Sequence, residues 1–195
     1  MSNHFFAMLS RLKYIQRWAL MRNTQSENLS DHTVQVAFIA HVLAVIGNRR
    51  LKKQYNADRV AVLALYHDVT EILTGDMPTP IKYKNETIRR AYKDVEKEAA
   101  GRLVKMLPDD LKEDFGLILS PCDEDKELMK LVKAADKISA LIKCIEEKRA
   151  GNMEFRNAET ENLKLIKQLG CDEAEIFLSE FLEAYSLNLD ELTAI

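Results

Sequence analysis

The sequence predicts an all-α protein that folds as a single compact helical bundle around a central buried helix. Hydrophobic residues make up 47% of the 195 residues, while the chain contains only 6 Gly and 4 Pro. Such a composition is typical of a packed globular chain and excludes a fibrous or disordered one. Apolar residues recur at helical spacing in most segments between the helix breakers. We expect one domain over residues 1–195, which is long enough to bury a substantial core.

The first half of the chain contains three predicted helices. The first covers about 5–16, and the second begins near Asn28 or Ser30, ends at Gly47 and has an apolar side. Residues assigned to that side are Val34, Ala37, Phe38 and Val45. The third starts near residue 56 and includes 60–65, which is apolar on every side and therefore predicts a helix buried all round. Gly75 should stop this helix, and the prolines at 78 and 80 should prevent any further helix there.

The second half continues as helices with short breaks. We expect a long amphipathic helix, a shorter one, and then a helix from about 123 to 149. The two helices before it are predicted at 85–107 and 109–119. The segments after it are predicted at 157–169 and 172–185, with a final turn at 187–192. An apolar stripe on the last long helix predicts that the C-terminal helices, about 157–195, either cover the core or form a subunit contact. Its residues are Ile176, Phe177, Phe181, Leu182 and Tyr185.

Charge and cysteine content narrow the class of protein. The net charge is −3, so no basic excess indicates binding of a nucleic-acid polymer, and any nucleotide ligand should be small. The three cysteines form no CxxC pair, which predicts reduced thiols in a cytoplasmic protein. The longest apolar stretch, 34–46, is interrupted by Gln35 and His41 and is too short for a membrane span.

Polar residues interrupt the apolar helices at three places. His32 lies in the first turn of the second helix, His67-Asp68 ends the central helix, and Asp136 follows two alanines in a later helix. Glu71 follows His67 by four residues, so on a helix both side chains can point to one region. Buried imidazoles and carboxylates are tolerated when they pair with one another or bind a metal.

Simpler interpretations of each residue remain open at this point. His67 and Asp68 could form a buried pair without a ligand, and His32 could lie on the surface. Asp136 could pair with Lys133 or Lys137. His41 is half a rotation from His32 around the helix, so we expect it in the core or behind the site.

The order His, His-Asp, Asp on separate helices resembles the signature of the HD-domain phosphohydrolases, which bind a divalent metal. Additional matches over about 5–150 resemble the bacterial 5'-deoxynucleotidases. The most specific of them are Arg17-Trp18 and the segment 75–80, called the Pro loop below. The matching segments are Arg17-Trp18, Ser30-Asp31-His32, Tyr66-His67-Asp68 with Glu71, Gly75-Asp76-Met77-Pro78-Thr79-Pro80 and Ala135-Asp136.

This resemblance implies an HD-domain fold and one divalent cation held by His32, His67, Asp68 and Asp136. A mixed nitrogen and oxygen ligand set with room for water suits Co²⁺ or Mn²⁺, our first choices, and also Zn²⁺, Ni²⁺, Fe²⁺ or Cu²⁺. It further implies hydrolysis of deoxyribonucleoside 5'-monophosphates to deoxynucleoside and phosphate, and we expect a homodimer.

The resemblance also implies roles for the residues around the cation. Arg17 would orient the phosphate and stabilise its charge, and Trp18 would lie where a ribose 2'-hydroxyl would project. Glu71 would be a general acid or base, or else would only orient His67. Asp76 would bind the sugar 3'-hydroxyl. Additional substrate contacts are expected from His32, Asp68, Met77, Pro78 and Thr79.

By residue type alone, Arg17 would be a surface charge, Trp18 a core residue and Asp76 a turn former.

Alternative functions share the metal site. An HD-type phosphodiesterase or a deoxynucleoside triphosphate hydrolase would differ in its product, although no basic cradle for a triphosphate is evident. A non-catalytic nucleotide-binding module would bind without turnover, and a purely structural helical protein would bind no metal.

Overall fold

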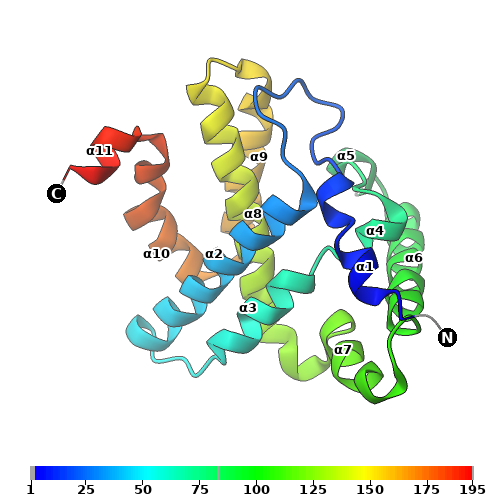
Figure 1. The fold of residues 1–195 in the computed structure, drawn as a ribbon. Helices are drawn as coiled ribbons and strands as arrows, with labels where there is room; N and C mark the ends of the chain where they lie inside the picture. The colour runs from blue at the N-terminus through cyan, green and yellow to red at the C-terminus, as the bar shows by residue number, and fades with distance from the viewer. Residues whose placement is uncertain (1–2, 83, 195) are drawn as a thin grey trace.

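The computed structural model describes residues 3–82 and 84–194, which form an all-α fold (Figure 1). Three helices lie at its centre: α2 (Leu29–Arg50), α3 (Ala57–Tyr66) and α8 (Lys126–Arg149). They pack against one another around the larger cluster of buried apolar side chains. Within the described residues, the one extended pairing is an isolated antiparallel bridge between Gln16 and Asn28. The all-α prediction is confirmed.

The remaining elements surround this centre. A second apolar cluster, formed by Phe5, Leu12, Leu29, Val69, Leu103 and Leu107, joins the N-terminal elements to α6. The bounds of the other elements are α1 (Phe5–Leu9), η1 (Leu12–Tyr14), α4 (Glu71–Thr74), α5 (Thr79–Lys82), α6 (Glu86–Val104), η2 (Asp109–Leu111), α7 (Lys112–Leu119), η3 (Asp123–Asp125), η4 (Met153–Phe155), α9 (Arg156–Leu169), α10 (Asp172–Phe181), η5 (Leu182–Ser186) and α11 (Leu189–Thr193).

The central helix is shorter than predicted. α3 ends at Tyr66, a tight turn follows, and α4 begins at Glu71. The Ala64 carbonyl accepts from the ring Nδ1 of His67 at 2.7 Å and from the His67 amide at 3.4 Å. It therefore does not accept from the amide of Asp68, as it would in a continuous α-helix. The prediction of one continuous helix through His67, Asp68 and Glu71 was therefore wrong, as was burial all round, since Leu65 is exposed.

The Pro loop also differs from the prediction, because a short helix forms inside it. Pro80 is the second residue of α5. In the first turn of a helix the amide N–H has no partner within the helix, so proline is tolerated there. The Pro78 carbonyl accepts hydrogen bonds from the amides of Ile81 and Lys82. The short helix thereby places Lys82 at the end of the loop.

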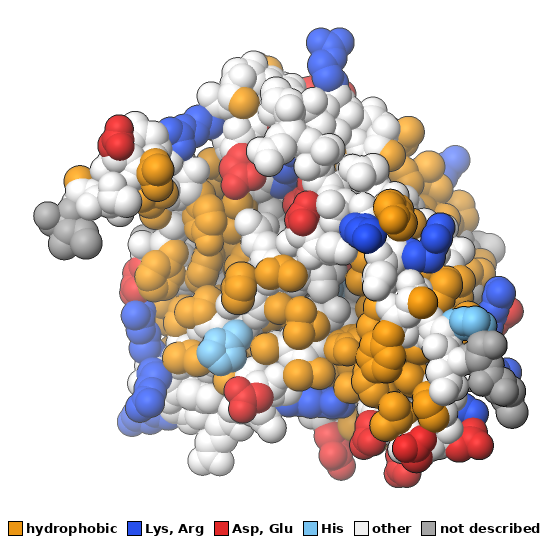
Figure 2. Space-filling model, viewed as in Figure 1, with side chains coloured by type: hydrophobic (Ala, Val, Ile, Leu, Met, Phe, Trp, Pro, Cys, Tyr) orange, Lys and Arg blue, Asp and Glu red, His pale blue; other side chains and the backbone are white. Residues whose placement is uncertain are grey.

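The predicted apolar side of α2 is buried only in part. Ala37 is buried and Val45 is partly buried, but Val34 and Phe38 are 46% and 71% exposed. His41 is also exposed, so its predicted place in the core or behind the site was wrong. Figure 2 shows apolar side chains gathered over α2 and α3 on this face of the molecule. Because α2 is apolar on nearly every side, its periodicity does not indicate which face packs inward. Its inner face is set by contact with α3 and α8.

α2 also continues past the predicted end at Gly47. A Cβ on Gly47 would lie 2.6 Å from the Tyr55 ring, so glycine allows the chain after α2 to pack closely against the helix. The apolar segment is also longer than the predicted stretch 34–46, so the conclusion that it is too short for a membrane span was wrong: by length and mean hydropathy, α2 would suffice. However, 56% of its apolar window is buried inside the protein. A buried core helix meets the same criterion.

The C-terminal helices lie on the larger cluster. α9 packs along α8, and α10 contacts both α2 and α8. Ile166, Ala174 and Phe177 are buried in the larger cluster. α9 and α10 therefore cover the core, whereas Leu189 and Leu192 of α11 are exposed, and the expected homodimer stays a prediction.

Candidate metal centre and active site

Four polar side chains converge between the central helices. His32 comes from the first turn of α2, His67 and Asp68 from the turn after α3, and Asp136 from α8. His32 Nε2 lies 3.6 Å from Asp68 Oδ2 and 3.3 Å from Asp136 Oδ1. His67 Nε2 lies 3.1 Å from Asp68 Oδ2. Ligand atoms of His32, His67 and Asp68 all lie within 4.8 Å of one another, which is close enough to share one ion.

Asp136 has two sets of neighbours. Its Oδ1 faces His32 and lies 4.0 Å from Arg17 Nη2, while its Oδ2 lies 3.0 Å from Lys137 Nζ. The simpler interpretation from the sequence, a pair with Lys137, is therefore present together with the approach to the histidine. One carboxylate oxygen points to the cluster and the other is held by the lysine.

Hydrogen bonds orient both imidazole rings. Ser139 Oγ donates to Gln35 Oε1 at 2.5 Å, so its oxygen accepts from His32 Nδ1 at 3.0 Å. Nδ1 of His67 donates to the Ala64 carbonyl. In their neutral forms both rings therefore present the lone pair of Nε2 to the carboxylates. Within the described part of the chain, neither buried Nε2 has a hydrogen-bond partner, an arrangement that a bound cation would satisfy.

The carboxylates in the cluster are ionised at neutral pH. Burial alone would raise the pKa of Asp68, but the adjacent His67 ring outweighs it and lowers the pKa to about 2. Burial likewise opposes ionisation of Asp136, whose pKa is held well below its usual range by Lys137 and His32. The cluster thus combines two anionic oxygen donors with two nitrogens, and these residues fit a divalent transition-metal ion.

The two histidines differ in their protonation. Burial, followed by the charge of Arg17, lowers the pKa of His32, which favours the neutral ring. Burial would also lower the pKa of His67, but Asp68 raises it above the ordinary value. A cation bound at Nε2 would compete with a proton for that nitrogen.

Glu71 lies at the start of α4 beside the cluster. Its side chain is buried, and its Oε2 has no hydrogen-bond partner among the described residues. Burial and the charges of Asp68 and Asp76 raise the pKa of Glu71 to about 9, although Lys82 acts in the opposite direction. Lys82 Nζ lies 4.0 Å from Glu71 Oε1. At neutral pH the carboxyl is therefore protonated and can donate a proton.

Arg17 and Trp18 lie in the loop between η1 and α2. Arg17 Nη1 donates to Glu27 Oε2 at 2.6 Å, and Trp18 Nε1 donates to the same oxygen at 2.9 Å. The Arg17 side chain is 12% exposed, so it is not the surface charge that residue type alone suggested. The Trp18 ring lies 5.2 Å from the Phe155 ring, measured between centroids, but remains partly exposed.

The sequence model of the family described as 5'-deoxynucleotidase YfbR-like matches residues 4–185. The chain belongs to this family. The 5'-deoxynucleotidase of Photorhabdus temperata is 49% identical over 98% of this chain and 97% of its own length. That of Pectobacterium atrosepticum is 48% identical over 98% of this chain and 96% of its own length. Membership in the YfbR-like 5'-deoxynucleotidases makes the protein a phosphohydrolase.

Solved structures support the HD-domain fold. An HD-domain phosphohydrolase from Listeria innocua has a TM-score of 0.79 at 23% identity, covering 95% of this chain and 90% of its own. The cyanophage S-2L HD phosphohydrolase, described as bound to dA and one catalytic Zn²⁺ ion, has a TM-score of 0.67 at 17% identity over 91% of this chain and 96% of its own. At these identities the likeness concerns the fold.

The Pro loop carries the remaining residues assigned through the resemblance to these 5'-deoxynucleotidases. Asp76, Met77 and Pro78 are partly buried, while Thr79 is exposed at the start of α5. Burial raises the pKa of Asp76, and the charge of Arg17 lowers it, which reflects the proximity of the two groups. The loop therefore faces the same region as Arg17.

Sequence reasoning missed two charged residues beside the site, Glu27 and Lys82. Glu27 contacts both Arg17 and Trp18, and the available signal was that it is the one acidic residue before Asp31. Lys82 lies near Glu71 and donates to Glu96 at 2.8 Å. Nothing in the sequence pattern distinguished it from other lysines.

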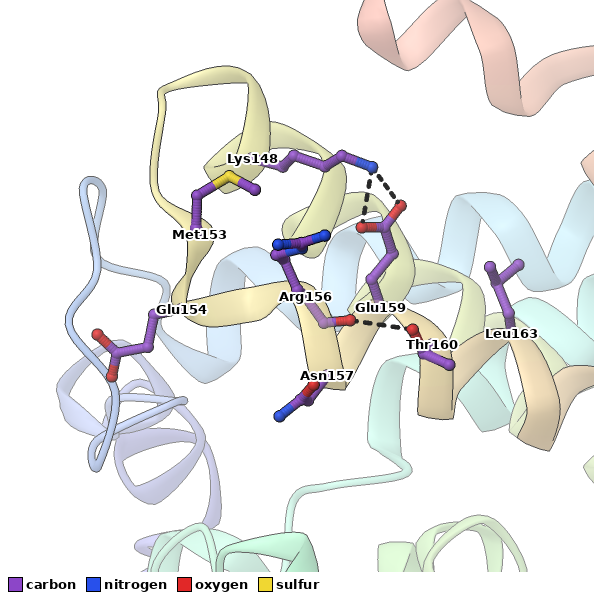
Figure 3. A pocket seen from close by; sticks show the side chains of 8 residues that line it. All are labelled: Lys148, Met153, Glu154, Arg156, Asn157, Glu159, Thr160 and Leu163. Atoms are coloured by element: carbon purple, nitrogen blue, oxygen red, sulfur yellow. Dashed lines mark hydrogen bonds and ion pairs between the residues drawn. The ribbon is translucent and has the colours of Figure 1, made fainter.

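A pocket of about 510 Å³ lies elsewhere, at the end of α8, η4 and the start of α9 (Figure 3). Lys148 and Glu159 form an ion pair at 3.0 Å in its lining. Lys148 is separated from Asp136 by about 18 Å along α8, at roughly 1.5 Å per residue. This pocket is distinct from the metal centre, although Glu154 in its lining binds the amide of Arg22 in the loop that carries Trp18.

Proposed function

We propose that the protein hydrolyses deoxyribonucleoside 5'-monophosphates to deoxynucleoside and phosphate, using one divalent cation held by His32, His67, Asp68 and Asp136. The observation that carries the proposal is the pair of buried, unpaired imidazole nitrogens facing two carboxylates beside Arg17. The family relation supports the reaction class, since the curated relatives are named 5'-deoxynucleotidases.

The ligand set favours Co²⁺ or Mn²⁺, and Zn²⁺, Ni²⁺, Fe²⁺ or Cu²⁺ would also suit its nitrogen and oxygen donors. When bound, the cation would lower the pKa of the attacking water and offset charge on the phosphoryl oxygens. Ser139 and the Ala64 carbonyl hold the two imidazoles in the required orientation. His32 and Asp68 would then lie against the phosphate as well as the cation.

Arg17 would bind the phosphate. One guanidinium nitrogen is held by Glu27, and another lies 4.0 Å from Asp136 at the edge of the cluster. A guanidinium fixed in this way can donate to phosphoryl oxygens without reorganising as charge develops. Arg17 would thereby stabilise the transition state.

Glu71 would be the general acid. Water supplies the new P–O bond, and the bond to the 5'-oxygen breaks, so the departing oxygen needs a proton. Burial and neighbouring carboxylates raise the pKa of Glu71 to about 9, which favours the protonated form that can donate to this oxygen. Proton transfer from such a group contributes roughly 10²- to 10⁴-fold to the rate.

Trp18 and the Pro loop would select the sugar. A flat apolar ring offers no hydrogen-bond partner to a 2'-hydroxyl, whose burial would then be costly. Asp76 would accept a hydrogen bond from the 3'-hydroxyl, with Met77, Pro78 and Thr79 lining the pocket. The contact with Trp18 would favour deoxyribose over ribose, whereas Asp76 would bind the 3'-hydroxyl that both sugars carry.

The test is phosphate release from dAMP and AMP with each divalent metal added in turn to metal-free protein. We expect activity that needs a metal and is faster on dAMP, and a Glu71→Gln variant that keeps its metal but loses turnover. Equal rates on both nucleotides would remove the role of Trp18. Pyrophosphate or triphosphate as the product from dATP, or nucleotide binding without any turnover, would replace the proposal by one of the alternative functions.

A further inference from the structure

We propose that Glu27 is a positioning residue that holds the Arg17 guanidinium and the Trp18 indole in one arrangement, and so couples phosphate binding to sugar selection. The roles of Arg17 and Trp18 rest on the proposed function. The contacts that connect them through Glu27 do not depend on it.

A single oxygen makes the connection. Oε2 of Glu27 accepts from Arg17 Nη1 at 2.6 Å and from Trp18 Nε1 at 2.9 Å. The Glu27 side chain is 13% exposed, so both hydrogen bonds are largely shielded from water. Hydrogen bonds to an ionised carboxylate are stronger than neutral ones. Neither side chain can turn away without losing its bond to the same atom.

The backbone strengthens the arrangement. The amide of Arg17 donates to the Glu27 carbonyl at 2.9 Å, next to the bridge between Gln16 and Asn28. Trp18 has a φ of +58°, in the left-handed region that bulky residues rarely adopt. Such a conformation persists only where surrounding contacts determine it, and the Glu27 carboxylate supplies the one hydrogen bond of the Trp18 indole.

Charge explains why Arg17 needs this partner. Its Nη2 lies 4.0 Å from Asp136 Oδ1, which belongs to the metal cluster. Without the Glu27 carboxylate, the attraction of Asp136 would draw the guanidinium toward the cluster. Arg17 would then neutralise a proposed metal ligand instead of meeting the phosphate.

The rest of the loop is held independently of Glu27. At the top of Figure 1 the loop lies beside the end of α8, where Glu147 accepts from the amide and hydroxyl of Thr24 and Lys143 donates to the Gln25 carbonyl. Beyond α8, Glu154 accepts from the Arg22 amide. A change at Glu27 should therefore alter the two side chains while leaving the loop in place.

The first test measures steady-state kinetics of Glu27→Gln on dAMP and AMP with Mn²⁺. We expect kcat/KM on dAMP to fall by about 10- to 100-fold, with a rise in KM, and the dAMP to AMP ratio to approach one. Glu154→Gln is the matched control, because it removes the same charge from a carboxylate that accepts from the same loop but touches neither Arg17 nor Trp18. Its kinetics should change by less than about twofold.

The second test needs neither metal nor nucleotide. Trp18 is the one tryptophan of the chain, so its fluorescence reports directly on the contact with Glu27. In Glu27→Gln we expect stronger quenching by acrylamide and emission at longer wavelength, whereas Glu154→Gln should match the wild type. Unchanged fluorescence, or changed fluorescence with an unaltered dAMP to AMP ratio, would overturn the coupling. Absence of phosphate release by the wild type would refute the proposed function, while fluorescence would still decide whether Glu27 holds Trp18.

Discussion

Removal of the Glu147 carboxylate should destabilise the protein in a pH-dependent way. Glu147 lies on α8, is 1% exposed, and accepts from Lys143 Nζ at 2.5 Å. It also accepts from Asn152 Nδ2 at 2.7 Å and from the Thr24 hydroxyl at 2.8 Å. Burial alone would raise its pKa, but Lys143 and the other donors lower the pKa from 4.5 to about 2.

The size of the effect follows from this difference in pKa. A folded pKa of about 2 against 4.5 corresponds to about 3 kcal/mol of stability at neutral pH. Since the folded pKa is the lower one, this stability is present above the unfolded value of 4.5 and is lost as the pH falls toward 2. Glu147→Gln keeps the shape of the side chain but leaves the buried Lys143 without its counter-charge, which is itself costly.

The assay is urea unfolding of the metal-free wild type and Glu147→Gln, both in chelator, at several pH values. We expect the variant to be less stable by about 3 kcal/mol at pH 7, and this gap to shrink to roughly half by pH 3. Glu161→Gln is the control: Glu161 is 63% exposed and lies 4.0 Å from Lys164, so its loss should cost less than about 0.5 kcal/mol. A gap at Glu147 below about 1 kcal/mol, or one that does not vary with pH, would refute the reasoning.

Two further predictions concern the metal centre and its proton donor. Ser139→Ala removes the acceptor of His32 Nδ1 and should weaken metal affinity about 10- to 100-fold, measured by competition with a chelator. The control is Thr33→Val, at a buried hydroxyl without a partner among the described residues, which should leave metal affinity unchanged. Equal affinity in both variants would contradict the role of Ser139. Lys82→Met removes the positive charge that lowers the pKa of Glu71, so the loss of kcat at basic pH should move to higher pH. Lys82→Arg keeps the charge and should leave this pH dependence unchanged. If the loss of kcat stays at the same pH in Lys82→Met, the titration of Glu71 is excluded as its cause.

The sequence predicted those residues of the candidate site that stand out from their immediate neighbours in the chain. His32, His67, Asp68 and Asp136 are polar interruptions in apolar helices, and their order resembled a known signature. The structure brings them together from three elements. Glu27 and Lys82 were missed because a charged residue in a polar segment is indistinguishable, by type alone, from one exposed to solvent.

The sequence by itself determined the helical class, the order of the main helices and the set of polar residues within them, because apolar periodicity and helix breakers act over a few neighbouring residues. Only the tertiary structure decided which face of α2 is buried, where the central helix breaks, and which way the imidazoles point. α2 is apolar on nearly every side, so α3 and α8 select its inner face. The His32 ring is oriented by Ser139, which is 107 residues away along the chain. Such contacts depend on how distant segments pack, and no local pattern encodes them.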